Sequence, residues 1–249
     1  MELTPFVRLA VLIVRPGAVV LSAPLFGGTQ VPPMARIGLS VLLALVLAPV
    51  VAPPSGGADL VLLLGRELMI GVSIGLAIRI VVSAAELAGY LAGFQAGFSV
   101  AAVIDPQQGV RNNMIASLYG LMALFVFFAI DGHHTVLIAL TDSYEALPIG
   151  GGAVGESLVG AVAGAMGLIF SFGLRLAAPV VFALLIVELG LGLVARAMPA
   201  MNLMVIGFPV RTLAGLIALA LAAGVLPPVV RMLMPGAFEL AASTASAFR

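Results

Sequence analysis

Several charged side chains lie inside or at the edges of long apolar stretches, and their chemistry is the most informative in this sequence. They are Arg66, Glu67, Arg79, Glu86, Arg175, Glu188 and Arg211. A charge at the centre of a bilayer costs about 3 kcal/mol on insertion scales, whereas a central leucine returns only about 0.5 kcal/mol. We therefore expect most of these groups to pair across helices or to face a wet interior. The candidate buried charge pairs involve Glu67, Arg79, Glu86, Arg175 and Glu188.

Glu67, Gly71, Gly75 and Arg79 follow a four-residue step along one of these stretches. On a helix such a step drifts by about 40° each time, so the residues form one slowly turning stripe. One interpretation is a conduit or a surface for contact with another subunit. The other is intramembrane ion pairing that only fixes helix packing. The sequence leaves both open.

The only two histidines lie in the segment Asp131-Gly132-His133-His134. A zinc site needs three or four protein ligands, adjacent helical residues point about 100° apart, and the chain has no cysteine. We therefore expect no metal ion and no cofactor, and we interpret Asp131 as a loop residue or a helix N-cap. No nucleophile–base arrangement is evident among the residues, so the sequence predicts that the protein is not an enzyme.

Composition defines the class of protein that must position these groups. Of 249 residues, 62% are hydrophobic and only 9% are charged, and the mean hydropathy is +1.25. A soluble domain carries roughly 25% charged residues. These values exclude a water-soluble monomer and a disordered chain, and the lack of cysteine excludes a disulfide scaffold. The net charge is +0 and there is no basic run, so nucleic acid is not an expected partner.

The apolar stretches predict an all-α fold of membrane-associated helical hairpins, with about six apolar helices. Several of these helices are broken by proline or glycine, for example at Pro16 and Pro179. We expect a loop over residues 131–157 and a last internal break at 198–202. The whole chain, 1–249, is interpreted as a single domain with a frayed tail at 240–249. Beyond the N-terminal segment, the candidate helical stretches are 37–58, 60–85, 112–130, 157–174, 176–195 and 212–230.

Glycines at four-residue spacing are a second feature of these stretches. Gly89, Gly93 and Gly97 form a double GxxxG pattern, and Gly71 and Gly75 share the same spacing. The lack of a Cβ atom lets two helix backbones approach closely. We therefore expect close helix packing at all five positions. Whether the partner helix belongs to this chain or to another subunit stays open.

Four segments of the sequence form a characteristic ordered set. They read "RPGAVVLSAPLFGGTQVPPMARIGLS", "AGYLAGFQAGFSVAAVIDPQQG", "DGHHTVLIALTDSYEALPIG" and "RAMPAMNLMVIGFPVRTLAGL". Together they resemble the FliR family, the flagellar member of the type III secretion export-gate proteins, and the resemblance runs from Arg15 to Leu216. The positions that match the family's loops are Asp131, Gly132, His133, Arg196, Pro199 and Asn202.

The resemblance implies a non-enzymatic subunit of the flagellar export gate in the bacterial inner membrane, at the flagellar basal body. Such proteins assemble with FliP-type and FliQ-type subunits, joined by FlhB-type and FlhA-type proteins, and unfolded flagellar proteins pass through the channel. The family's loop after the glycine-rich helix plugs the closed channel. Carried over, this loop is Phe98 to Asn113, and an ordinary interhelix loop is the alternative. The candidate plug residues are Phe98, Ser99, Val100, Ala101, Asp105, Pro106, Gln107, Gln108 and Gly109.

Two other functions remain open on the residues alone. A small-molecule or ion transporter with broken helices would bind solute near Glu67, Arg79 and Glu188. A membrane scaffold would have no passage role. A transporter predicts an internal repeat with matched helix breaks, and the sequence offers no convincing repeat.

Overall fold

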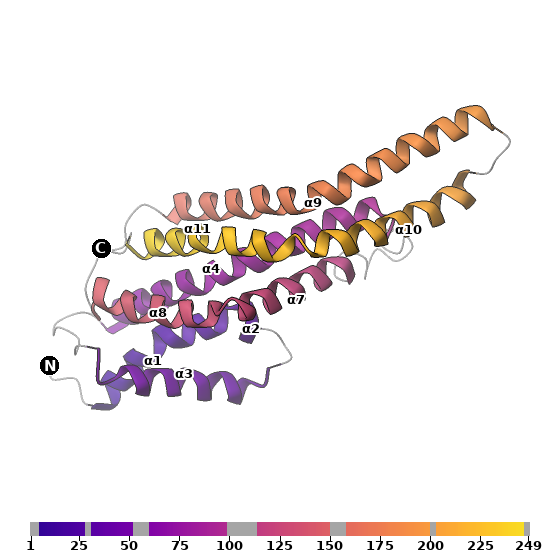
Figure 1. Cartoon of the computed structure of the whole chain (residues 1–249). Coiled ribbons are helices and arrows are strands. Elements are labelled where there is room, and N and C mark those ends of the chain that lie inside the picture. The colour runs from indigo at the N-terminus through magenta and orange to yellow at the C-terminus, as the bar shows by residue number, and fades with distance from the viewer. Residues whose placement is uncertain are drawn as a thin grey trace. The chain divides into compact units, whose positions relative to one another are not determined.

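The computed structural model describes residues 5–27, 31–51, 60–98, 114–149, 158–199 and 203–246. Within these ranges the chain forms helices and no strand, which confirms the all-α fold class (Figure 1). In chain order the helices are α1 (Pro5–Ser22), α2 (Pro24–Gly27), α3 (Pro33–Leu47), α4 (Leu60–Gln95), α7 (Met114–Ala129), α8 (Gly132–Ala146), α9 (Leu158–Ala197), α10 (Leu203–Ala223) and α11 (Leu226–Ser246).

Several helix boundaries differ from the predicted ones. The stretches 157–174 and 176–195 form one helix, α9, with Pro179 inside it. The expected loop at 131–157 contains α8, because this segment has one buried face, with Leu140, Ser143 and Tyr144, and can pack despite its polar residues. The stretch 212–230 is divided by a turn at Gly224 and Val225. The expected count of about six helices was therefore too low.

The C-terminal segment also differs from expectation. We expected residues 240–249 to be frayed, but α11 continues to Ser246. Ala237 and Ala241 on this helix are buried, at 0% and 5% exposure, so packing holds the last turns in place. The tail prediction was thus wrong for the part that lies within α11.

The end of α4 has a defined capping geometry. Gly97 has a φ of 90°, its N–H donates to the carbonyl of Phe94 at 3.1 Å, and the N–H of Phe98 donates to the carbonyl of Gly93 at 3.0 Å. This pair of bonds is the Schellman motif, which needs a left-handed residue after the helix and favours glycine there. The helix therefore ends where glycine permits the reversal.

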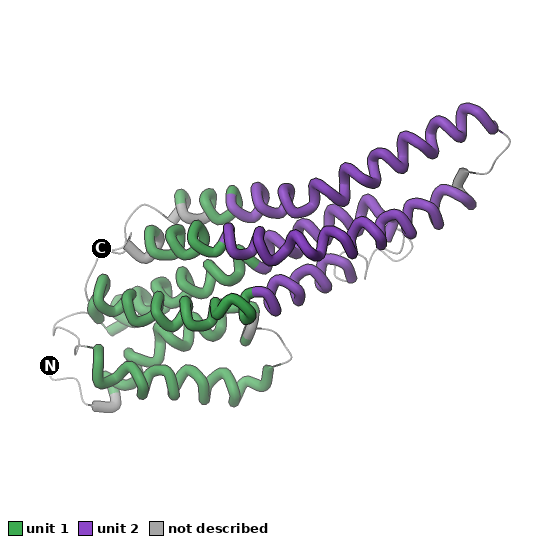
Figure 2. The backbone as a smooth tube through the Cα atoms, in the orientation of Figure 1, with its two compact units in different colours: residues 1–81, 127–167, 234–249 green, residues 82–126, 168–233 purple. Residues whose placement is uncertain are grey.

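The chain forms two compact units, shown in green and purple in Figure 2. Unit 1 comprises Met1–Val81, Phe127–Gly167 and Met234–Arg249, and unit 2 comprises Val82–Val126 and Leu168–Leu233. The units are interleaved along the sequence, and α4, α7, α9 and α11 each contribute residues to both. That the whole chain acts as one domain stays a prediction.

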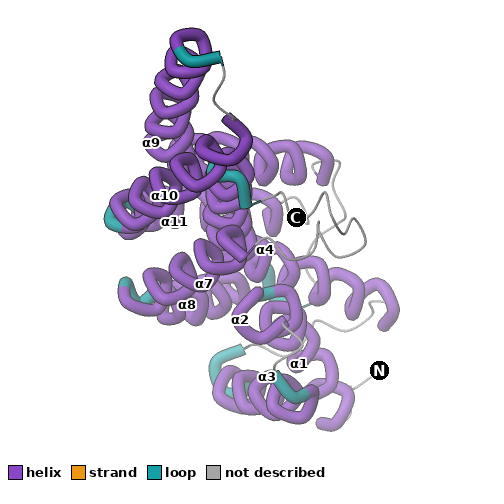
Figure 3. The backbone as a smooth tube through the Cα atoms, turned by 90° about the vertical axis from the view of Figure 1, so that its right-hand side faces the viewer, coloured by secondary structure: helices purple, strands orange, loops and turns teal. Residues whose placement is uncertain are grey.

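Unit 1 is built around α1, α3 and the first part of α4. Helices α1 and α3 lie side by side (Figures 1 and 3). The guanidinium of Arg8, near the start of α1, donates to the carbonyls of Ala48 and Val51 at 3.2 and 3.1 Å. These carbonyls come just after the end of α3. The start of α1 therefore lies beside the end of α3, and the two helices run antiparallel. Arg8 binds carbonyls at the C-terminal end of α3, where basic side chains are favoured. The hydrophobic core of unit 1 also contains apolar residues of α8 and of the segment that follows α8. Its members include Leu12, Val19, Ala44, Leu47, Ile70, Ile74, Leu140, Tyr144 and Ile149.

Unit 2 joins the end of α4 to α7, α9 and α10 through small residues. A Cβ atom built on Gly173 of α9 would lie 3.1 Å from the carbonyl oxygen of Ala84 on α4. A Cβ on Gly215 of α10 would meet the side chain of Ala96 at the end of α4. The hydroxyl of Tyr119 on α7 donates to the carbonyl of Leu219 on α10 at 3.5 Å. Close approach at small residues is the usual way in which membrane helices associate.

Three of the described helical segments are long and apolar enough to cross a membrane: Leu60–Gln95, Ala163–Ala197 and Val205–Ala223. The pair α7 and α8, bent by 71° at its break, would make a fourth span. The most apolar part of α4 is 67% buried, whereas those of α9 and α10 are only 17% buried. The apolar faces of α9 and α10 therefore need lipid or another protein as cover.

Candidate functional site

A buried ion pair joins α1 to α4 inside unit 1. The Nε atom of Arg15 lies 2.8 Å from Oε2 of Glu67, and Nη2 of Arg15 lies 2.9 Å from Oε1. The two side chains are 0% and 1% exposed. A guanidinium and a carboxylate joined by two parallel hydrogen bonds form the strongest kind of charge pair. Glu67 is thus paired, but with Arg15, which is not among the charged residues that the sequence singles out.

The rest of the Arg15 guanidinium contacts the C-terminal end of α8. Its Nη1 donates to Oγ of Ser143 at 3.0 Å, and its Nη2 donates to the carbonyl of Leu147 at 3.0 Å. Its Cζ lies 4.0 Å from the ring centroid of Tyr144, a cation–π distance. We call these five residues, Arg15, Glu67, Ser143, Tyr144 and Leu147, the Arg15 cluster. It connects α1, α4 and α8.

The sequence of α8 explains why this helix end meets Arg15. Leu140, Ser143, Tyr144 and Leu147 follow helical i, i+3, i+4, i+7 spacing and share one buried face. Leu147 follows the last residue of α8, where carbonyls lack partners within the helix. A positive group there is favoured by the helix dipole as well as by the hydrogen bond.

Gly71 and Gly75 bring α4 against the backbone of α1. A Cβ atom on Gly71 would meet the carbonyl oxygen of Arg15 and lie 2.6 Å from Cβ of Ala18. A Cβ on Gly75 would meet Oγ of Ser22 and lie 3.1 Å from the carbonyl oxygen of Val19. At both positions the close neighbour belongs to this chain.

The next glycines of the series have different surroundings. A Cβ on Gly89 would lie 2.7 Å from the carbonyl oxygen of Ile115 and 2.8 Å from Cα of Ala116, on α7. Gly93 is buried. Gly97 has room, because its Cβ would lie 3.4 Å from the Phe208 ring, so its positive φ is what requires glycine. The GxxxG pattern thus includes both a packing contact and a helix cap.

The remaining charged candidates are arranged differently from the expected buried pairs. Arg79 is exposed on this chain. It lies twelve residues beyond Glu67, about 120° around the helix by the four-residue drift, so the two cannot share a face. Arg175 is also exposed, with its Cζ 5.4 Å from the Phe172 ring centroid. For these two arginines this chain shows no buried ion pair among the described residues, so the expectation of a buried charge pair stays a prediction there.

Two further acidic side chains lie in unit 2. Glu188 of α9 pairs with Arg211 of α10 at 2.7 Å, with the side chains 29% and 39% exposed. Glu86 of α4 is half-buried, and its Cγ would lie 2.9 Å from a Cβ atom on Gly120 of α7. The pair of Glu188 and Arg211 joins the two helices with the most exposed apolar faces.

The family loop positions are only partly covered by the structure. Phe98 is 37% exposed just after α4, while Ser99, Val100, Ala101, Asp105, Pro106, Gln107, Gln108, Gly109 and Asn202 lie outside the described residues. Asp131 is the N-cap residue of α8, as the sequence indicated, but its side chain makes no capping hydrogen bond. Gly132 is buried and His133 is half-buried, whereas Arg196 and Pro199 are exposed.

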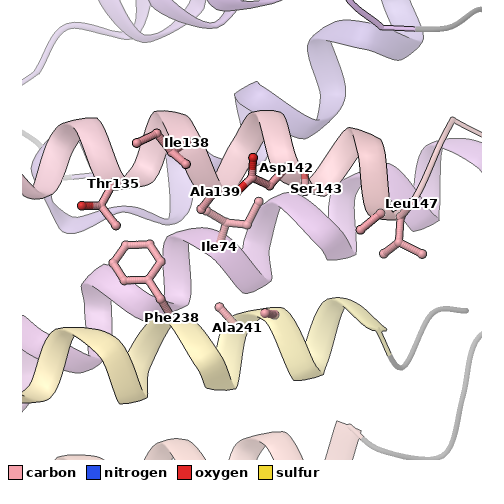
Figure 4. Close-up of a pocket in the computed structure, with 11 residues that line it drawn as sticks. Ile74, Thr135, Ile138, Ala139, Asp142, Ser143, Leu147, Phe238 and Ala241 are labelled. Carbon is pink, nitrogen blue, oxygen red and sulfur yellow. The ribbon is translucent and has the colours of Figure 1, made fainter.

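A cavity of about 390 Å³ lies beside the Arg15 cluster in unit 1 (Figure 4). Residues of α4, α8 and α11 line it, and the Phe238 side chain points from α11 toward α8. Its wall is apolar except for a few polar side chains, including Thr135 and Asp142. It lacks the convergent polar groups that would orient a reacting substrate.

The helices and their buried charges define the class of this protein, which is a helical membrane protein with three or up to four spans among the described residues. Comparison with known proteins gives the family. Residues 6–236 match the family of bacterial export proteins, family 1. The chain therefore belongs to this family.

Relatives within the family cover most of the chain. It is 34% identical to the flagellar biosynthetic protein FliR of Pectobacterium carotovorum over 241 residues, which are 96% of this chain and 90% of that protein. It is 32% identical to FliR of Bacillus subtilis over 232 residues, 91% of this chain and 90% of that protein. It is 29% identical to the Yop proteins translocation protein T of Yersinia pestis over 199 residues, 78% of this chain and 75% of that protein.

Proposed function

We propose that this protein is a non-enzymatic subunit of the flagellar type III export gate. The observation that carries the proposal is the family match over residues 6–236, together with FliR relatives that cover over nine-tenths of the chain. The apolar helices suit a place in the bacterial inner membrane at the flagellar basal body. The protein's work is then the passage of unfolded flagellar proteins, and the driving energy comes from elsewhere.

The partners of this subunit are FliP-type and FliQ-type proteins, with FlhB-type and FlhA-type proteins around them. The exposed apolar faces of α9 and α10 support this part of the proposal. Phe182, Leu189, Leu193 and Leu213 on these helices are each more than 60% exposed. In a bilayer such side chains are covered by lipid or by neighbouring helices, and helix association there is driven by close packing and not by removal from water. An assembly of sister subunits provides such packing.

The segment Phe98 to Asn113 closes the channel at rest in this proposal. It begins where α4 ends, at the Gly97 cap. The segment combines apolar residues such as Val103 and Ile104 with uncharged polar ones such as Gln107. An apolar constriction excludes water and ions by dewetting.

Co-expression and gene deletion test the proposal. The tagged protein should copurify with FliP-type and FliQ-type subunits of the same bacterium, and a strain without it should export no flagellar proteins. Isolation as a stable monomer that binds neither subunit, with export unaffected in the deletion strain, would contradict the proposal. The transporter alternative predicts solute uptake without these partners. It gains no support from Glu67, whose carboxylate is bound by Arg15.

A further inference from the structure

Three metal-ligating side chains gather at the start of α8. Asp131, His133 and His134 each offer one ligand atom, and these atoms all lie within 4.8 Å of one another. Nδ1 of His134 is 3.7 Å from Oδ1 of Asp131. The ring centroids of His133 and His134 are 4.2 Å apart, with an angle of 40° between the ring planes. This proximity is the observation on which the inference rests.

The local backbone explains how neighbouring residues come together here. Asp131 has a φ of 57°, a left-handed conformation that is uncommon for any residue but glycine. It is the residue before α8 begins, so its carboxylate lies beside the first turn of the helix. Adjacent histidines leave a helix about 100° apart. Their long side chains nevertheless lean toward the N-terminus of the helix, and the rings lie next to each other.

The side chains have coordination sites to spare. The distance of 3.7 Å between His134 and Asp131 is too long for a hydrogen bond. Nδ1 of His133 is buried and has no hydrogen-bond partner among the described residues. The centroid of the Phe128 ring lies 5.6 Å from that of the His133 ring. Asp131 and His134 are 72% and 64% exposed, so an ion can reach the cluster from water.

We propose that Asp131, His133 and His134 bind a divalent first-row transition metal ion such as Zn²⁺. Two imidazoles and one carboxylate are a ligand set that suits zinc, cobalt and nickel, whereas magnesium and calcium prefer oxygen ligands alone. Three protein ligands leave a coordination position open for water or for a further ligand. The sequence led us to expect no metal here, because adjacent histidines on a helix were assumed to point apart. In the structure the two imidazole rings lie side by side, so that assumption does not hold.

The bound ion has a structural role in this proposal. It joins the carboxylate of Asp131, the residue between α7 and α8, to two side chains of the first turn of α8. This holds Asp131 in its left-handed conformation. Metal binding then stabilises the folded protein by an amount that grows with the logarithm of the free ion concentration once the ion is in excess of its Kd.

The test uses the full-length protein in detergent, purified through a tag without histidine. Zn²⁺ is titrated by calorimetry, and Co²⁺ is titrated by its visible absorption. We expect saturable binding of one ion per chain, and a rise in Tm with Zn²⁺. Asp131→Asn, His133→Gln and His134→Ala should each weaken binding by roughly tenfold or more, because even loss of an outer-shell partner costs that much. Glu145→Gln, an exposed acid on the same helix, is the matched control and should bind as the unchanged protein does.

Clear results would overturn the inference. They are an absence of saturable Zn²⁺ and Co²⁺ binding, equal binding in all three variants, or equal affinity for Mg²⁺. His134→Ala keeps the test decisive if the other variants misfold, because His134 is 64% exposed and its loss removes little buried surface. This test does not depend on the proposed export function. If the export function proved wrong, the result of the metal titration would still stand.

Discussion

The guanidinium of Arg15 binds the carboxylate of Glu67 through two parallel hydrogen bonds of 2.8 and 2.9 Å, in a place where neither side chain reaches solvent. Two further donors of Arg15 bind Ser143 and Leu147. Every strong polar interaction of this arginine is therefore internal to unit 1. A charge pair of this kind does not serve a passing solute, and it fixes how α1, α4 and α8 meet.

The first prediction concerns the loss of one member of this pair. Arg15→Met leaves the Glu67 carboxylate buried and unpaired, which costs about 3–5 kcal/mol for a buried pair. We expect a marked drop in the Tm of the detergent-purified protein and in its level in membranes. The double variant Arg15→Met, Glu67→Leu removes both charges and should recover most of the loss. Arg79→Met, at an exposed arginine of α4, is the control and should behave as the unchanged protein. A double variant as unstable as the single one would contradict this account.

The second prediction concerns the contact of α4 with α1. Gly71→Ala places a Cβ atom on the carbonyl oxygen of Arg15, a backbone atom that cannot move aside alone. Overpacking of this kind costs about 1–3 kcal/mol. Gly65→Ala, on the same helix, meets nothing within 4 Å and should be neutral or slightly stabilising, because alanine favours helices. Thermal unfolding of the two variants side by side measures the difference. Equal Tm values would show that the helices do not pack as closely as the structure indicates.

The sequence predicted the class of fold well, because its long apolar stretches are a strong local signal. It also singled out Glu67, Gly71 and Gly75 as members of one stripe. It did not identify Arg15 as their partner. Arg15 is 52 residues from Glu67 along the chain, and only tertiary packing brings the two side chains together. The orientation of Arg79 could have been foreseen from the drift of the stripe around the helix.

Helix boundaries were predictable only where composition changes sharply. The polar residues of α8 suggested a loop, and the buried side that makes it a helix depends on Arg15 and the core of unit 1. The predicted stretches were divided at Arg175 and Pro179 was read as a break, yet α9 continues through both positions. Proline within an apolar helix is tolerated when neighbouring groups satisfy the freed carbonyls. The error at α8 arose from tertiary contacts that no local pattern records.

The third prediction concerns the cap at the end of α4. Gly97→Ala forces a side chain into a φ of 90° and should cost about 1 kcal/mol or more, although no atom blocks the new methyl group. Gly97→Asn should cost less, since asparagine tolerates left-handed conformations. Thermal unfolding of the two variants gives the order, with alanine the less stable. The reverse order would indicate that contact with the Phe208 ring, and not backbone conformation, selects glycine here.

The fourth prediction tests the proposed seal of the channel. Deletion of residues 107–113 should leave the complex with FliP-type and FliQ-type subunits intact on a native gel, because the packing contacts described above lie elsewhere. It should make membranes that contain the complex leaky to small ions, since the dewetted constriction is lost. A matched deletion of the same length at the C-terminus, residues 243–249, is the control for chain shortening and should cause no leak. Unchanged ion permeability in the loop deletion, with the complex assembled, would count against a seal formed by this segment. It would leave membership of the export gate untouched, because assembly and sealing are read by separate measurements.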